Sequence, residues 1–304
     1  MKKNIAFFLV LFLPVFSLHA CEICGCGVGN FYMGQLPGFK SKFIGIRYQY
    51  MSYHSELASD KSQFSNDSYQ TTEIWSGLNI GNRWQVLAFV PWQFNKKISD
   101  DGITHTSGVG DISLLANYRL VHTLHTNNHN HAVEQELLAG AGIKLATGKY
   151  QVDLSNPVTN TGDVNSQNGT GSNDLLLNAI YQLRIGKTGF SSFASYKWSG
   201  TNSAGYRFGN RITLSALGYH RFRFSGIGLS PNLGLLFEKS AGNTNQHEPI
   251  EQTGGYVLNA TGGIEVNFNK ITLGLNTQLP ISQRFSEGQT RSLNRTVLHL
   301  SFAL

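Results

Sequence analysis

Charged residues are scarce in this sequence. Asp, Glu, Lys and Arg make up 14% of its 304 residues, against about 25% in an average soluble domain. Lys and Arg form no cluster or stripe, so the sequence predicts no nucleic-acid partner. The composition also argues against disorder, because Phe, Trp and Tyr reach 12% of the chain and disordered segments combine high charge with few aromatics.

Long hydrophobic runs are absent beyond the N-terminus. Lys2 and Lys3 precede the apolar stretch Ile5–Leu18, and the small residue Ala20 follows it. A basic start, a short apolar run and a small residue before the cleavage point are the three parts of a secretory signal. The run is shorter than the roughly 20 residues that a spanning helix needs. The sequence therefore predicts a signal peptide over residues 1–20 and no transmembrane helix in the mature chain.

Cysteine is confined to the predicted mature N-terminus, where Cys21, Cys24 and Cys26 form a C-x-x-C-x-C cluster. This spacing can place two or three thiolates on one soft ion such as Cu(I) or Zn(II), although the fold requires no cofactor. A disulfide formed in an oxidising compartment and acylation of Cys21 at a lipoprotein-type cleavage site are the competing interpretations. We expect residues 21–41, rich in Cys and Gly, to form a periplasmic segment that acts as a plug or a metal-binding head.

A second candidate metal site is a histidine-rich connection predicted at Val121–Ala132. It contains His122, His125, His129 and His131, on the same predicted side of the membrane as the cysteines. Four imidazoles beside a thiolate cluster favour a shared metal site. The alternative is a solvated polar hairpin.

From Lys42 onward the sequence alternates between apolar and polar residues. Ile44, Ile46 and Tyr48 share one parity, for example, and Gly45, Arg47 and Gln49 the other. Twelve such segments follow one another, each of about 10–14 residues, whereas strands in soluble sheets average about 5–6 and a tilted membrane-crossing strand needs about 9–11. The sequence therefore predicts an all-β fold, a twelve-stranded antiparallel transmembrane β-barrel over residues 42–304. A soluble β-sandwich is the alternative, which would have to bury the whole apolar parity between two sheets.

The connections between these segments alternate in length. Long polar ones, such as Ser55–Ser68, Asn95–Ser107 and Thr147–Gly171, alternate with turns as short as Gly81-Asn82. Long outer loops, short periplasmic turns and aromatic girdles at strand ends are typical of outer-membrane barrels of Gram-negative bacteria. An even strand number places both termini in the periplasm. The expected partners are outer-membrane lipid, a small-molecule solute and the barrel-assembly machinery. The last of these is expected because the final strand, with its apolar alternation, ends the chain and resembles the signal that this machinery reads.

The polar parity identifies the predicted lumen lining. Acidic and basic side chains occur on neighbouring strands, which fits either a water-filled pore or a set of internal salt bridges. Single-sign rings, which would indicate ion selectivity, are absent. The predicted lining comprises Arg47, Glu73, Asp111, Arg119, Glu134, Glu136, Lys144, Asp174, Arg184, Lys197, Arg211, Glu238, Glu265 and His299. For Asp111 and Asp174, which follow Gly-rich loops, we favour a role in tying loop backbone over contact with solute.

Three sequence blocks resemble a known family. They are Gly108–Ile112 followed by Asn117–Leu120, then Gly142–Tyr150, and then Gly169–Asp174. They are similar to the "GxGD…YR", "PTG" and "GTGS.D" blocks of the outer-membrane "MetA-pathway of phenol degradation" family of transporters, although Ala146 stands where a Pro is usual. The resemblance implies the barrel fold and the outer membrane, and it leaves the solute open.

Together these observations predict a channel or transporter for a small solute, porin-like and linked to periplasmic copper or zinc handling. The runner-up is a non-conducting structural or surface barrel, or a lipid-modifying enzyme. Barrel hydrolases need a nucleophile and a base at the outer rim, where His54 lies near Ser52 and Ser55. Ser and His co-occur too often to indicate a catalytic triad without geometry, so we expect no enzymatic activity and no catalytic residues.

Overall fold

The computed structural model describes residues 42–57, 60–100, 102–127, 130–151 and 164–304. Within these ranges the chain is mostly β-strand, and no helix is long and apolar enough to cross a bilayer. The predicted signal peptide and the cysteine segment 21–41 lie outside the described residues, so the expectations for them stay predictions.

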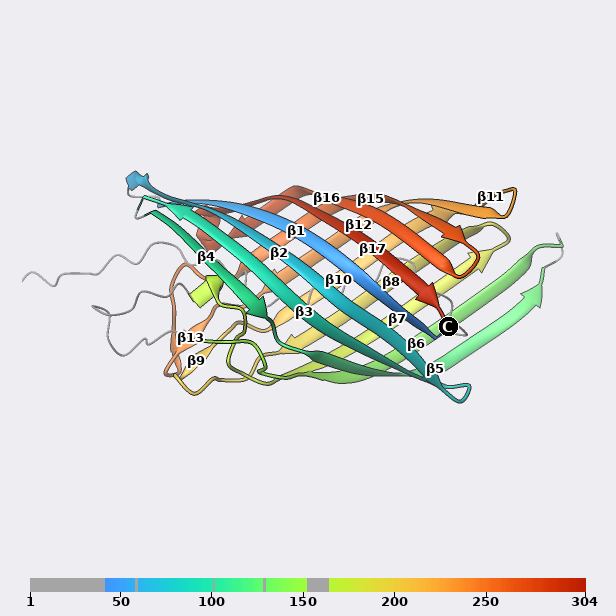
Figure 1. Ribbon diagram of the computed structural model, residues 1–304, viewed down its shortest axis with the longest axis horizontal. Coiled ribbons are helices and arrows are strands. Elements are labelled where there is room, and N and C mark those ends of the chain that lie inside the picture. Colours follow the sequence, from blue (N-terminus) through green and yellow to red (C-terminus); the bar gives the residue numbers. More distant parts are fainter. Residues whose placement is uncertain (1–41, 58–59, 101, 128–129, 152–163) are drawn as a thin grey trace, which may run out of the picture.

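Twelve antiparallel strands close into a β-barrel, which confirms the predicted fold class (Figure 1). Strands adjacent in sequence are adjacent in the wall, and the ladder between the first and last strands closes the cylinder. Closure is what a hydrocarbon environment demands, because an open sheet edge would leave backbone N–H and C=O groups without partners. The barrel strands are β1 (Phe43–Leu57), β2 (Asp60–Ile80), β3 (Trp84–Ser99), β5 (Ser113–Thr126), β6 (Ala132–Lys144), β7 (Asp174–Ile185), β8 (Thr188–Trp198), β10 (Arg211–His220), β12 (Ile227–Ser240), β15 (Gly255–Phe268), β16 (Ile271–Phe285) and β17 (Thr290–Ala303).

The two ends of the barrel differ. At the turn end, where the C-terminus lies in Figure 1, the backbone N–H of Leu304 donates to the carbonyl of Lys42 at 2.8 Å. Gly81, Gly186 and Asn269 have positive φ in the tight turns between strands. The opposite, loop end carries the longer connection between β6 and β7. It also carries a small sheet of β9 (Tyr206–Arg207), β13 (Thr244–Asn245) and β14 (Glu248–Pro249).

Three predicted connections are partly strand, which corrects the sequence-based boundaries. β1 continues to Leu57 and β2 begins at Asp60, so the predicted loop Ser55–Ser68 is mostly ladder. In the same way β3 runs to Ser99 and pairs with β4 (Gly102–Val109), and β5 runs to Thr126. Beyond the hydrocarbon both faces of a strand meet water, so backbone pairing continues without the alternation that identifies a half-buried strand.

One predicted strand is interrupted. The predicted connection Asn95–Ser107 implies that the next alternating strand starts at Gly108 and is continuous, but β4 ends at Val109 and β5 begins at Ser113. β3 pairs with β4 along its loop-end half and with β5 along its turn-end half. The three residues between the two strands leave the ladder, and Asp111 among them serves the loop end, as described below.

The outer face of the wall is apolar and the inner face is mainly polar. Ile46 is 54% exposed and Trp84 48% exposed, whereas Arg47 between such residues is only 5% exposed. Exposed aromatics include Trp84 and Phe268 at the turn end, Trp198 at the loop end of β8, and Trp92 in the middle of β3. An apolar exterior flanked by aromatic residues matches a lipid-facing barrel surface.

Candidate functional site

None of the fourteen residues of the predicted lumen lining is exposed at the molecular surface. The structure also shows which oppositely charged side chain most of these residues contact. Oppositely charged side chains are joined across neighbouring or nearly neighbouring strands. A charge buried in this way is tolerated because its counter-ion is in direct contact.

The most connected of these ion pairs centres on Lys144, at the loop end of β6. Its Nζ lies 2.6 Å from Oδ2 of Asp111 and 3.2 Å from Oδ2 of Asp174, and it donates to the Ser172 carbonyl at 3.0 Å. Lys197 approaches the same oxygen of Asp174 at 3.6 Å. The side chains of Lys144 and Asp174 are 4% and 1% exposed. Two carboxylates therefore share one buried ammonium, and Lys197 supplies a second cation beside Asp174.

The two carboxylates also bind loop backbone. Asp111 accepts hydrogen bonds from the N–H groups of Gly148 at 3.0 Å and Thr170 at 2.9 Å. Asp174 accepts from the Gly200 N–H at 3.0 Å and the Ser172 hydroxyl at 3.0 Å. These contacts match the interpretation that we favoured for both residues, that they tie loop backbone. They also explain why the chain leaves the ladder at Asp111, which has to reach the β6–β7 connection.

Toward the turn end, three further contacts between charged side chains form a second set of ion pairs. Arg119 lies 2.8 Å from Glu136, and Glu134 contacts Arg184 on one side and His122 at 3.5 Å on the other. Glu134 and Glu136 are therefore both engaged with basic side chains on adjacent strands. For Glu134 and Glu136, this arrangement favours the interpretation as internal salt bridges that stabilise the wall. It disfavours the alternative that these acids are free to contact a solute.

Arg47 and Glu73 are direct cross-strand neighbours on β1 and β2, with 2.5 Å between Nη2 and Oε1. The guanidinium carbon of Arg47 also lies 5.6 Å from the ring centroids of both Trp75 and Phe89. A guanidinium over an aromatic face gains electrostatic attraction, more so when water is excluded. Arg47 is thereby held against the wall.

Two pairs reach over intervening strands. Nη2 of Arg295 on β17 lies 2.8 Å from Oε2 of Glu238 on β12, with β15 and β16 between them in the sheet. His299 approaches Glu265 at 3.9 Å by lying over Gly274, where a Cβ would collide with its Nε2. The absence of a side chain at Gly274 thus lets the imidazole lie flat along the wall.

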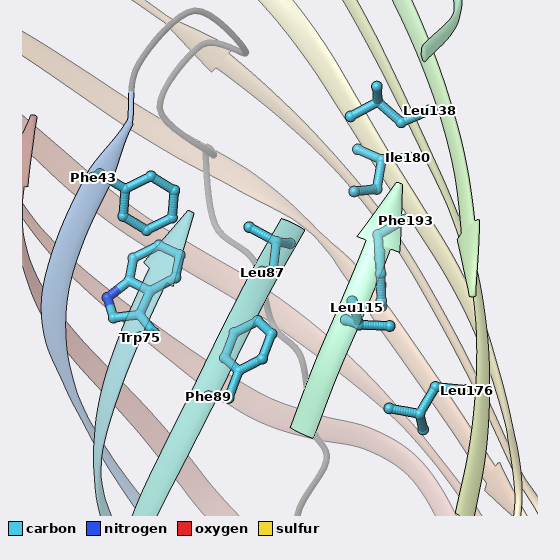
Figure 2. Packing of buried hydrophobic residues seen from close by; sticks show 9 residues of the cluster. All are labelled: Phe43, Trp75, Leu87, Phe89, Leu115, Leu138, Leu176, Ile180 and Phe193. Carbon is cyan, nitrogen blue, oxygen red and sulfur yellow. The ribbon is translucent and has the colours of Figure 1, made fainter. Parts of the chain in front are cut away.

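An apolar belt on the inner face was not predicted from the sequence. It occupies one half of the barrel, from β1 to β8 (Figure 2), and its members are 0–7% exposed. The signal was present: Trp75, Leu87, Phe89 and Leu115 are apolar residues on the parity that otherwise carries polar ones. The belt consists of Phe43, Trp75, Leu87, Phe89, Leu115, Leu138, Leu176, Ile180 and Phe193.

The other half of the inner wall is lined mainly by polar side chains. β12, β15 and β16 contribute buried hydroxyl and amide groups, including Ser230, Thr261, Asn276 and Gln278. The Thr261 hydroxyl donates to Oδ1 of Asn276 at 2.8 Å. The apolar belt thus lies in the β1–β8 half of the wall, which also carries buried polar side chains such as Gln85 and Asn117.

The predicted metal ligands are only partly described. Cys21, Cys24, Cys26 and His129 lie outside the described residues, whereas His122, His125 and His131 lie on or beside the β5–β6 hairpin. Among the residues that the structure places, no three His, Cys, Asp or Glu side chains gather closely enough to hold a metal ion. The metal site therefore stays a prediction.

At the loop end, Ser52 and His54 do not form a catalytic pair. The Ser52 hydroxyl donates to Asn294 at 3.0 Å, while the ring nitrogens of His54 lie 3.0 Å from Glu56 and 2.7 Å from Asn66. Hydrogen bonds to Glu56 and then Asn66 raise the pKa of His54 above its ordinary 6.5. The Ser52 hydroxyl is bonded to Asn294 and both ring nitrogens of His54 are occupied by other residues, so this geometry does not activate Ser52 as a nucleophile.

Comparison with known proteins identifies the fold. Neither a family model nor a curated protein sequence matches this chain. Among solved structures, an outer-membrane channel from Pseudomonas putida F1 is similar with a TM-score of 0.59 and 17% identity, covering 87% of this chain and 96% of the channel. The β-domain of the Bordetella autotransporter Brka matches with a TM-score of 0.51 and 8% identity, covering 87% of this chain and all of that domain, 100%. At these identities the likeness shows the outer-membrane barrel fold.

Proposed function

We propose that this protein is an outer-membrane channel that passes a small solute through its lumen. The observation that carries the proposal is a closed barrel whose exterior is apolar and whose interior holds charged, amide and hydroxyl side chains. A fold with no inner pathway would have no need of so many polar groups in its interior, since each costs free energy to bury. The likeness to a solved outer-membrane channel supports the same function.

Conductance tests this proposal. We expect the purified full-length protein to give discrete current steps in a planar lipid bilayer. Because the Arg295–Glu238 pair reaches over two strands, its removal in an Arg295→Ala, Glu238→Ala double variant should widen the pathway and raise the unit conductance severalfold. The matched control is Arg223→Ala, on the exposed strand β11 (Phe222–Phe224), which should leave the conductance unchanged.

The second candidate function is a sealed structural or surface barrel. The same Arg295–Glu238 contact and the closely packed belt favour it, because both occupy space inside the cylinder. Folded protein that gives no current, in the parent and in the double variant alike, would establish the sealed barrel and reject the channel.

A link to periplasmic copper or zinc handling is a separate part of the proposal. It is supported by the sequence cluster Cys21, Cys24 and Cys26 and by the histidines of the β5–β6 connection. We expect a Cys24→Ser, Cys26→Ser variant to lose most of the copper or zinc that elemental analysis detects in the parent protein, because thiolates bind these ions more tightly than hydroxyls do. Equal metal content in both proteins rejects the site, and intact mass shows whether Cys21 carries acyl chains.

A further inference from the structure

The exposed charges are distributed unevenly between the two ends of the barrel. Within the described ranges, the exposed acidic side chains, such as Glu56, Asp100 and Glu251, lie at the loop end, and none lies at the turn end. Exposed basic residues occur in the connections of the turn end. They include Lys42 before β1, Arg83 between β2 and β3, Lys187 between β7 and β8, and Lys270 between β15 and β16. The outside of the turn end is therefore positively charged.

Arg83 is held beside the aromatic residues of the outer wall. Its Nη1 donates to the hydroxyl of Tyr118 at 2.7 Å, and the Tyr118 ring meets the edge of Trp84 with 4.9 Å between the centroids. Trp84 is 48% exposed on the outer face. Its guanidinium group has five N–H donors in a planar fork that matches a phosphate, more than one hydroxyl can accept. Arg83 thus lies where the lipid-facing wall meets the turn.

Lys270 has a similar setting on another part of the same end. Its Nζ lies 5.7 Å from the ring centroid of Phe302. Ile271 pairs with Phe302 on one side and with Phe268 on the other, and these three side chains are 43–51% exposed. An ammonium group therefore lies next to an exposed apolar surface. Both this turn and the β2–β3 turn are at the end where the C-terminus is marked in Figure 1.

We propose that the turn end binds the headgroups of anionic phospholipids at two sites, one at Arg83 and one at Lys270. A cation directly beside lipid-facing aromatic or aliphatic side chains suits a ligand that joins a negative headgroup to acyl chains. The phosphate contacts the cation, and the chains cover the apolar wall. A soluble acidic ligand would use the cation alone. The expected orientation, with short turns toward the periplasm, assigns both sites to the periplasmic leaflet. This inference goes beyond the proposed channel, because lipid binding outside the wall needs no open lumen.

Native mass spectrometry of the detergent-solubilised full-length protein tests the sites. The probes are phosphatidylglycerol and phosphatidylcholine with identical acyl chains, supplied in equal amounts. Both lipids carry the phosphate, but the choline cation leaves phosphatidylcholine without net charge. We expect severalfold more bound phosphatidylglycerol than phosphatidylcholine. An Arg83→Gln, Lys270→Gln variant should bind phosphatidylglycerol about fivefold more weakly at each site, the effect of removing one cation near an anionic headgroup.

The matched control removes one lysine and one arginine from the loop end. Lys149→Gln, in the β6–β7 connection, and Arg291→Gln, on β17, are both at exposed positions. This double variant should keep the preference for phosphatidylglycerol. An equal loss in the control would overturn the proposal, since net charge rather than two sites would then select the lipid.

Two further results would also overturn the proposal. One is equal binding of the two lipids by the parent protein, or an unchanged preference in the folded Arg83→Gln, Lys270→Gln variant. The other is binding of a short polyglutamate peptide by a parent protein that shows no preference between the lipids, which would assign the turn end to an acidic polypeptide.

Discussion

Replacing Lys144 by Met is expected to lower the free energy of unfolding by about 3–5 kcal/mol, the cost of removing one partner from a buried ion pair. The substitution preserves the length of the side chain and removes the charge shared by Asp111 and Asp174, whose side chains are 7% and 1% exposed. Asp174 retains Lys197, whereas Asp111 loses the ammonium of Lys144 and keeps its hydrogen bonds to loop backbone. Urea titration of the folded protein in lipid vesicles, followed by tryptophan fluorescence, measures the change.

The matched control for this prediction is Lys239→Met on β12. Lys239 is exposed, and its removal should change the free energy of unfolding by no more than about 0.5 kcal/mol. A Lys144→Met, Asp111→Asn double variant should recover part of the loss, because the uncompensated carboxylate is gone. If Lys144→Met is as stable as the control, the buried group does not hold the loop end together.

Replacing Gly140 by Val is expected to cost about 3 kcal/mol, the upper end of the usual penalty for overpacking. A Cβ at Gly140 would collide with Oδ1 of Asn117 and lie 2.6 Å from the backbone oxygen of Ala116. Asn117 is fully buried, and it donates to Gln85 at 3.3 Å and accepts from Asn178 at 2.8 Å. The new side chain therefore both crowds the wall and breaks an amide network. The measurement is again urea titration in vesicles.

Ala139→Val is the control for Gly140→Val. Ala139 is the preceding residue on β6, so its side chain points to the opposite face of the wall, toward lipid. An added methyl pair there meets flexible lipid chains, and we expect little change in stability. Comparable losses in both variants would show that β6 tolerates no branched residue in general, and would contradict a specific clash inside the lumen.

The fold was predictable because lipid constrains one face of every strand. The hydrocarbon requires apolar residues at positions such as Ile44, Ile46 and Leu78, so alternation identifies the strands and their outward parity. No comparable constraint acts on the parts of the strands that extend past the hydrocarbon and its flanking aromatic residues. The extension of β1 to Leu57 and of β5 to Thr126 therefore could not be recognised from the pattern.

The inner face was less predictable. Parity predicts which side chains point inward, and the fourteen charged or imidazole residues that it selects are all buried or half-buried. Their partners depend on register and on how far a side chain reaches. Neighbouring strands explain Arg47 with Glu73, but Arg295 meets Glu238 across two intervening strands. The belt escaped recognition because a lumen accepts apolar residues wherever they pack against one another.

The ladder between β1 and β17 has a consequence for biogenesis. It joins Phe43 to Ala303, so the wall is complete only when the last strand has been synthesised and placed. Any shorter nascent chain has two open sheet edges, and lipid offers no hydrogen-bond partner to the backbone N–H and C=O groups along them. Insertion strand by strand is therefore unfavourable for this protein, because both edges of an incomplete sheet would face lipid until β17 pairs with β1.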